Sequence, residues 1–164
     1  MATDWDRIVR EHGPMVYGTA WRILGRAADA EDVVQDVFLQ VHQLQQTHPV
    51  RYWVALLRRL AACRALDRLR QRRKTVSLDG LQLASTVDAP DAALLERETT
   101  ERFREAVAQL PRREGEVFCL RYFEELSYQQ IAETLSITAG AAAAALHKAR
   151  AKLEAVLVEP VERE

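Results

Sequence analysis

The side chains best placed to do chemistry in this 164-residue sequence are arginines, and the chemistry they support is the binding of phosphate groups. Nine basic residues and a single acid, Asp67, lie between positions 51 and 74. One carboxylate pairs with one or two of them, so we expect the rest to face phosphates or solvent. Binding of this kind is strongly salt-dependent, and a merely solvated helix face is the alternative. The residues assigned to DNA here are Arg58, Arg59, Arg64, Arg68, Arg70, Arg72, Arg73 and Lys74.

A second candidate site lies nearer the C-terminus, where a tight turn separates two helical segments. Ser127 and Gln130 have the spacing of a capping box, which predicts that a helix starts after Ser127. Residues 136–138 form the turn, and Ala132 is small enough for two helices to cross closely. This pattern predicts a helix-turn-helix that places its second helix in a major groove; a plain helical hairpin is the alternative. The polar candidates for DNA contact are Ser127, Tyr128, Gln129 and Thr138.

The segment just before the basic residues is a third candidate. Residues 43–50 read as a loop rich in Gln, Thr and His, whose side chains can read base edges. An aromatic side chain such as Trp53 can stack on an unpaired base for roughly 1–3 kcal/mol, although a core position is the simpler interpretation of Trp53. The loop residues assigned to DNA are Gln45, Gln46, Thr47 and His48.

Acidic residues gather at the start of the preceding helix. Acids in a first turn stabilise a helix through its dipole, which is the simplest interpretation of them. The functional alternative is a docking face for a basic or mixed partner helix. The residues concerned are Asp29, Glu31, Asp32 and Asp36, together with Gln35.

Patterns of catalysis or metal binding are absent as far as spacing shows. The histidines are scattered, neither Cys63 nor Cys119 has a CxxC partner, and no glycine-rich phosphate loop occurs. We therefore expect no enzyme activity, no metal and no cofactor, with both cysteines in the core. No apolar run approaches about 18 residues, and residues 1–10 lack the apolar segment of a secretion signal, so we expect no membrane insertion. A secreted disulfide scaffold would use more than two cysteines, so we expect a cytoplasmic protein.

These candidates require an all-α fold, because helical periodicity dominates throughout. In the first half we expect a short helix capped by Thr3 or Asp4 and broken at residues 13–14, a second helix to about residue 24, a third over 30–44 opened by Asp29, and a long helix over 51–73. In the second half we expect helices ending near residues 110, 123 and 135, and a last one over 139–157. We therefore expect two small helical domains, residues 1–74 and 92–164, joined by a linker over residues 75–91.

The chain resembles the extracytoplasmic-function (ECF) group of the sigma-70 family of RNA polymerase sigma factors. Residues 29–38 (DAEDVVQDVF) resemble the family's polymerase-binding helix, and 65–74 (ALDRLRQRRK) its promoter-melting segment. Segments within 110–123, 126–132 and 146–150 are similar to its −35-binding domain. Each segment alone is moderately specific, but their order and spacing together are strongly specific.

This resemblance implies partners and roles. The protein would bind core RNA polymerase at the clamp helices of the largest subunit and at the flap of the second-largest subunit. It would also bind promoter DNA. The loop over 43–49 would capture a flipped base of the −10 element while the basic helix holds the melting strands. An anti-sigma factor is a possible further partner. The residues assigned to the polymerase are Asp29, Glu31, Asp32, Gln35, Asp36 and Phe38.

The expected recognition helix departs from the family because its first residues are one glycine and six alanines, at 139–145. Alanine favours the helix, but a methyl group cannot make a bidentate base contact. The absence of each such pairing removes about 1–3 kcal/mol of discrimination between bases. We therefore predict weak sequence reading at −35, with an interface to protein as the alternative. Phosphate contacts would remain from Arg112, Arg113, Lys148, Arg150 and Lys152.

Two competing functions stay open at this point. A helix-turn-helix regulator that acts without polymerase would need no acidic docking helix. A sigma-like interaction protein that lacks promoter recognition is favoured by the alanine-rich helix. We also hypothesise that the linker allows a closed arrangement in which the two domains pack together and cannot bind DNA.

Overall fold

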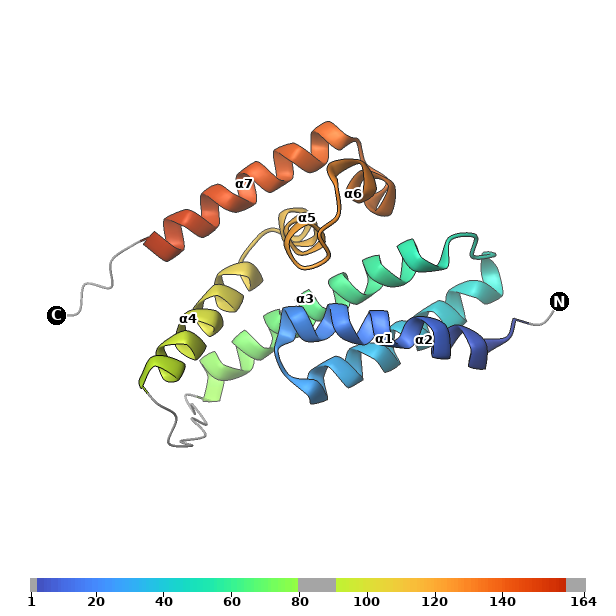
Figure 1. Ribbon diagram of the computed structural model, residues 1–164, viewed down its shortest axis with the longest axis horizontal. Coiled ribbons are helices and arrows are strands. Elements are labelled where there is room, and N and C mark those ends of the chain that lie inside the picture. Colours follow the sequence, from blue (N-terminus) through green and yellow to red (C-terminus); the bar gives the residue numbers. More distant parts are fainter. Residues whose placement is uncertain (1–2, 80–90, 159–164) are drawn as a thin grey trace.

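The structure is a computed structural model that describes residues 3–79 and 91–158, and it places seven α-helices and no strand in those residues (Figure 1). This confirms the all-α fold class. The expected linker falls largely on residues 80–90, outside the described part. No helix in the described ranges combines the length and apolarity that crossing a membrane requires.

The first three helices form one packed unit, in which α1 (Trp5–Leu24), α2 (Ala27–Thr47) and α3 (Trp53–Asp79) contact one another. Asp4 caps α1 by accepting a hydrogen bond from the backbone N–H of Arg7 at 3.1 Å. Gly25 ends α1 with a φ of 67°, a conformation that costs glycine little. The central side chains of this unit are fully buried and apolar: Val16, Ile23, Val33, Val37 and Leu57.

The predicted break at residues 13–14 is wrong, because α1 runs straight through Pro14. Proline removes one helical hydrogen bond and costs about 3 kcal/mol or more inside a helix. Ile8 before it and Val16 after it both pack on the same core, and this burial on each side of Pro14 offsets the cost.

The ends of α2 and α3 also differ from the sequence expectations. Helix α2 begins at Ala27, so Asp29 lies in its first turn and does not cap it. It continues to Thr47 because Val41 is buried and Leu44 half-buried on the same face, and the expected loop shrinks to the residues between Thr47 and Trp53. Helix α3 runs on to Asp79, past the expected end at residue 73.

The last four helices are α4 (Asp91–Ala108), α5 (Arg112–Tyr122), α6 (Tyr128–Leu135) and α7 (Ala139–Val158). The capping box is confirmed, with Ser127 and Gln130 each satisfying the other's backbone amide. Thr138 caps α7 by accepting from the Ala141 amide at 3.0 Å, and Ser136 makes the turn with a φ of 55°. The helix-turn-helix predicted here is therefore present.

The two units pack against each other and share one continuous apolar core. Helix α3 contacts α4, α5 and α6, so it lies between the other N-terminal helices and the C-terminal unit (Figure 1). A side chain on Gly115 of α5 would meet Leu66 of α3 at 3.5 Å, which shows how closely these helices approach. The close packing that we hypothesised from the sequence is what the structure shows.

Candidate nucleic-acid interface

The arginines of α3 are less free than the sequence suggested. As expected, Asp67 pairs with two of them, Arg64 at 3.7 Å and Arg70 at 3.8 Å. The expectation that all the others face phosphates or solvent is wrong, because α2 supplies further acids from more than thirty positions away in the chain. Arg68 donates to Asp32 and Asp36, both at 3.1 Å. Arg72 pairs with Asp29. The acidic first half of α2 therefore faces α3 and neutralises part of its charge.

Two further arginines of α3 reach the C-terminal unit. Arg58 Nε lies 3.4 Å from a carboxylate oxygen of Glu124, and Arg70 donates to the backbone oxygens of Ala108 and Leu110 at 3.3 and 3.0 Å. Arg64 binds the side chain of Gln40 within the N-terminal unit. Among the described residues, the basic side chains of 51–74 that make no ion pair or hydrogen bond are Arg51, Arg59, Arg73 and Lys74.

The expected base-reading residues straddle the end of α2. Gln45 and Thr47 lie on the helix itself, and Gln45 donates to Thr3, so its side chain is turned towards the N-terminus. Gln46, Thr47 and His48 are exposed. Trp53 packs edge-on against Trp5 at a ring separation of 5.8 Å, which supports its core interpretation.

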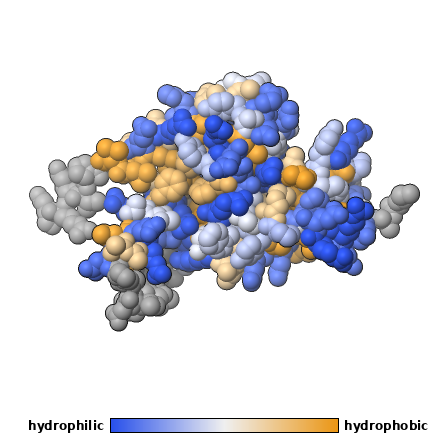
Figure 2. All heavy atoms as spheres, in the orientation of Figure 1, coloured by the Kyte–Doolittle hydropathy of each residue, from blue (hydrophilic) through white to orange (hydrophobic). Residues whose placement is uncertain are grey.

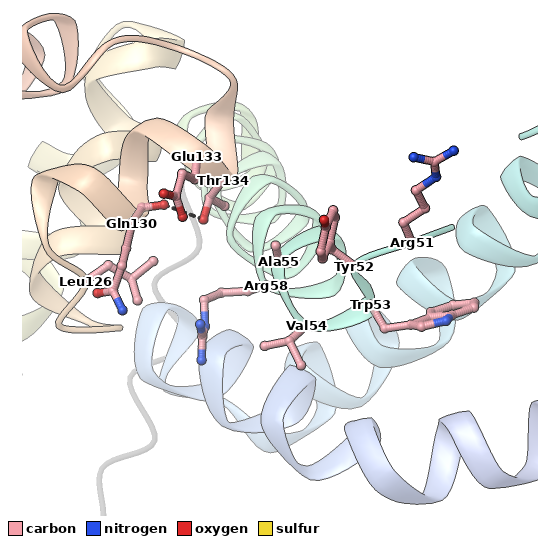
Figure 3. A pocket seen from close by; sticks show the side chains of 10 residues that line it. All are labelled: Arg51, Tyr52, Trp53, Val54, Ala55, Arg58, Leu126, Gln130, Glu133 and Thr134. Atoms are coloured by element: carbon pink, nitrogen blue, oxygen red, sulfur yellow. Dashed lines mark hydrogen bonds between the residues drawn. The ribbon is translucent and has the colours of Figure 1, made fainter. Parts of the chain in front are cut away.

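Tyr52 is the most exposed large apolar side chain of this region, with 79% of its surface accessible. It borders a groove of about 440 Å³ that lies between the start of α3 and α6 (Figure 3). Arg51 and Arg58 line one side of the groove, and Gln130 and Glu133 line the other. The start of α3 therefore faces the first helix of the helix-turn-helix.

An apolar groove of about 570 Å³ runs along the outer side of α1 and α2. Leu39, which is 64% exposed, stands beside it, and Gln35 and Phe38 are the two residues assigned to the polymerase that line it. Of the other assigned residues, Glu31 is exposed, while Asp29, Asp32 and Asp36 pair with α3. The remaining lining residues are Trp5, Val9, Val34 and His42.

The outward face of α7 carries methyl groups in place of polar side chains that could bind bases, as its alanines predict. Ala142 and Ala145 point into the core, whereas Gly140, Ala141 and Ala144 are exposed. Small inward residues let α7 lie close to α5 and α6, which it contacts. The alanines thus serve packing on one face and leave the other face of residues 139–145 without hydrogen-bonding side chains.

Most basic residues of the C-terminal unit already have partners. Arg112 and Arg113 both pair with Glu116, and Lys152 pairs with Glu114 at 2.8 Å. Arg150 donates to the Tyr122 hydroxyl. Lys148 is exposed and has no ion pair with a described residue.

The polar residues assigned to DNA lie at the starts of α6 and α7, where Ser127 and Thr138 act as caps. Tyr128 lies under the guanidinium of Arg121, and Gln129 donates to Glu133 at 3.3 Å. All four are exposed, so each retains a surface for a ligand.

Cys63 lies where the two units meet, and its thiol donates to Glu116 at 3.2 Å. Burial raises the pKa of Cys63 to about 12, with further contributions from the charge of Glu116 and from this hydrogen bond. Burial likewise raises the pKa of Cys119, which is fully buried as expected. The raised pKa values favour the protonated form of both thiols at neutral pH.

Sequence reasoning missed two sets of residues. Leu39 could have been found, because it is apolar and lies outside the stripe formed by Val33, Val37 and Val41. Arg22 and Glu124, which pair at 2.6 Å between the units, had no detectable signal. A contact between residues this far apart in the chain depends on the packing of whole units.

An arginine-laden helix in one unit and a capped helix-turn-helix in the next define a class of all-helical nucleic-acid-binding proteins. Comparison with known proteins narrows this class. Residues 8–75 match the family model for Sigma-70 region 2, and residues 100–153 match that for Sigma-70, region 4. The chain belongs to the sigma-70 family, in its ECF group of RNA polymerase sigma factors.

Individual relatives agree with this placement. The ECF RNA polymerase sigma factor SigL of Mycobacterium tuberculosis H37Rv is 31% identical over 156 residues, which cover 91% of this chain and 86% of SigL. SigW of Bacillus subtilis is 27% identical over 158 residues, covering 89% and 84%. The sigma factor RpoE, solved with the anti-sigma factor NepR from Bartonella quintana, aligns over 99% of this chain and all of that chain, with a TM-score of 0.54 at 20% identity.

Proposed function

We propose that this sigma factor directs bacterial core RNA polymerase to promoters and opens the −10 DNA as a dissociable subunit. The observation that carries the proposal is α3, a 27-residue helix with arginines around it, which begins beside the exposed Tyr52 and His48. Unpaired bases stacked on aromatics and phosphates held by arginines offset the cost of unstacking. Opening of this kind uses binding energy and needs no cofactor.

Docking on the polymerase is proposed for the groove on α1 and α2. Its lining is almost entirely apolar, and Gln35 supplies a polar side chain that fixes the orientation of a partner helix. The clamp helices of the polymerase's largest subunit are the partner that we propose. Asp32 and Asp36 flank this surface with about half of each side chain exposed, so they are available for a second interaction beside Arg68.

Weak sequence reading at −35 is proposed for α7. Methyl groups at Ala141 and Ala144 touch a base edge only through apolar contact, and Lys148 is the nearest cation without an ion pair to a described residue. Upstream DNA is then held mainly through phosphates and groove shape.

A second apolar surface supports protein docking on the C-terminal unit. Figure 2 shows apolar side chains over the C-terminal end of α7 and over α4. We propose that this surface meets the flap of the polymerase's second-largest subunit, and that an anti-sigma factor, such as the one solved with RpoE, competes for it. The exposed residues there are Leu94, Leu95, Val156, Leu157 and Val158.

The docking proposal is tested by Leu39→Ser. Leu39 is exposed, so the folded state should be unaffected while the affinity for core polymerase falls by roughly tenfold or more, as for an apolar anchor at an interface. The measurement is binding of labelled core polymerase, with Ala28→Ser as the control at an exposed position of the same helix outside the groove. Equal affinities of Leu39→Ser and wild type would show that the groove is not the docking site.

The alanine-rich face also favours a second candidate, a sigma-like protein that binds polymerase without recognising promoters. Run-off transcription by reconstituted holoenzyme on a genomic fragment library separates the two functions. Discrete start sites are expected from a promoter-recognising sigma factor. A stable holoenzyme that yields no transcript above core polymerase would instead support the second candidate.

A further inference from the structure

We propose that a cavity lined by four arginines binds a compact diphosphate anion, either free pyrophosphate or the diphosphate group of a nucleotide. The turn between α1 and α2, the later part of α3 and the second half of α4 form this cavity at one end of the molecule (Figure 1). The site goes beyond the proposed function, because it needs neither polymerase nor promoter DNA. We call it the arginine cavity, and its charged lining residues are Arg26, Arg72, Arg73, Glu101, Arg104 and Glu105.

Two of the four arginines are largely buried and fixed in position. Arg72 and Arg104 have only 15% and 18% of their side chains exposed. Arg72 donates to the backbone oxygen of Leu24 at 3.2 Å, and Arg104 donates to that of Ile23 at 3.1 Å, so both cap the C-terminal end of α1. A guanidinium group has five N–H donors, so each arginine keeps donors beyond this bond and its one ion pair.

Gly25 leaves the space that Arg104 occupies. A Cβ atom at this position would lie only 2.7 Å from Nη1 of Arg104. The φ of 67° at Gly25 also disfavours any residue with a side chain. Arg104 is therefore held against the end of α1 before any ligand arrives, and a ligand that binds it pays less entropy for ordering the side chain.

The other two arginines have no partner among the described residues. Arg26 and Arg73 are exposed, and neither makes an ion pair or a hydrogen bond through its side chain. A phosphate group offers an arginine both a counter-charge and paired hydrogen bonds. Because the whole chain has a net charge of −1, it has no general attraction for anions, and an anion that binds requires a local site of this kind.

The charge balance of the arginine cavity favours an anion. Glu101 neutralises Arg104, and Asp29, which lies beside the cavity, neutralises Arg72. Glu105 is the remaining carboxylate of the lining, and it is exposed without an ion pair to a described residue. The two unpaired arginines therefore face a single carboxylate, which opposes anion binding but does not cancel their charge.

The size and chemistry of the cavity narrow the class of ligand. Its volume is about 100 Å³, well below the roughly 300–1,000 Å³ of pockets that hold drug-sized molecules. No aromatic side chain lines it, and Leu69 and Ala108 are its apolar members, so it has no surface on which a nucleobase could stack. Four guanidinium groups offer more donors than one phosphate accepts, so an anion with two phosphoryl groups fits the site better.

The test is a calorimetric titration of the full-length protein with inorganic pyrophosphate, without Mg²⁺ and at constant ionic strength. We expect saturable binding and a rise in Tm, because the ligand binds only the folded protein. Orthophosphate should bind roughly tenfold more weakly or worse, since it lacks the second phosphoryl group. ADP distinguishes the two sources: affinity equal to that of pyrophosphate assigns the site to nucleotide diphosphates as well, and much weaker binding restricts it to the free anion.

Two variants of exposed side chains should shift the affinity for pyrophosphate in opposite directions. Arg26→Gln should weaken it roughly tenfold, through the loss of one charge-assisted hydrogen bond. Glu105→Gln should strengthen it, because it removes the like charge from the lining. The matched control is Arg10→Gln, which makes the same charge change as Arg26→Gln at an exposed position of α1 outside the cavity. Circular dichroism establishes that each variant retains its helices.

Two results would overturn the inference. One is the absence of saturation by pyrophosphate up to about 1 mM, the limit of a weak specific complex. The other is an equal loss of affinity in Arg26→Gln and Arg10→Gln, which would show that pyrophosphate senses overall charge and not the arginine cavity. Neither result bears on the binding of core polymerase, which is measured separately.

Discussion

A single glutamate, Glu116, determines the chemistry around the cysteine at the domain boundary. It pairs with Arg112 and Arg113 and accepts a hydrogen bond from Cys63, although its own side chain is only 6% exposed. A thiolate at this position would face a carboxylate in a poorly solvated site. The neutral thiol is therefore the form that the fold selects.

This selection has a measurable pH dependence. Because the pKa of Cys63 rises from 9.0 to about 12 on folding, the protonated thiol contributes stability below pH 9 that is lost as the pH rises towards 12. In a Cys119→Ala background we expect alkylation by iodoacetamide at pH 8 to be slower than for a free thiol by roughly two to three orders of magnitude. Mass spectrometry measures the rate, and labelling as fast as that of a free thiol would refute the assignment.

Glu116→Gln is the companion variant. It removes the charge that opposes thiolate formation while keeping a side chain of similar size, so labelling of Cys63 should accelerate. Burial is the larger cause of the pKa shift, so the rate should remain below that of a free thiol.

At the scale of residues, the sequence predicted which side chains are basic but not what binds them. The density of arginine over 51–74 predicts surplus positive charge, because Asp67 is the only acid within that segment. The antiparallel packing of α2 on α3 brings Asp32 and Asp36 to Arg68. Pairing of this kind depends on how the helices cross, and periodicity does not encode it.

At the scale of elements, α7 separates packing from recognition within one run of alanines. Ala144 is exposed and Ala145 is buried, although they are neighbours. Ala144→Arg should therefore tighten binding of upstream duplex DNA and steepen its salt dependence by about 1, through one added phosphate contact. Electrophoretic mobility shifts over a salt series measure both quantities.

Ala145→Arg is the matched control on the same helix. Burying a charge without a partner is strongly destabilising, so this variant should lose several kcal/mol in chemical denaturation. If Ala144→Arg were equally destabilising, the assignment of the two faces of α7 would be incorrect.

Element prediction succeeded where the signals were chemical and local. The capping box at Ser127 and Gln130, the turn at Ser136 and the cap at Thr138 all appear as expected. It failed at Pro14 and at the end of α2, where burial of residues in the adjoining turns decided whether a helix continued, and at the end of α3, which runs on to Asp79. Local propensity is a weak constraint when the adjoining turns are anchored in a core.

At the scale of the whole molecule, one apolar core spans both units, so their unfolding should be coupled. We expect wild-type protein to unfold in a single calorimetric transition, with equal calorimetric and van't Hoff enthalpies. Glu124→Gln should lower the transition temperature or split the transition in two. Two separate transitions in the wild type would mean that the interface is too weak to join the units thermodynamically.

The hydrogen bonds of Arg70 have one more consequence. The carbonyls of Ala108 and Leu110 that it binds belong to the end of α4 and the residues just after it, where backbone oxygens have no helical donor. A side chain of the N-terminal unit thus caps the C-terminal end of a helix in the C-terminal unit. If the units separate, the last turn of α4 loses these two hydrogen bonds, so we expect it to fray.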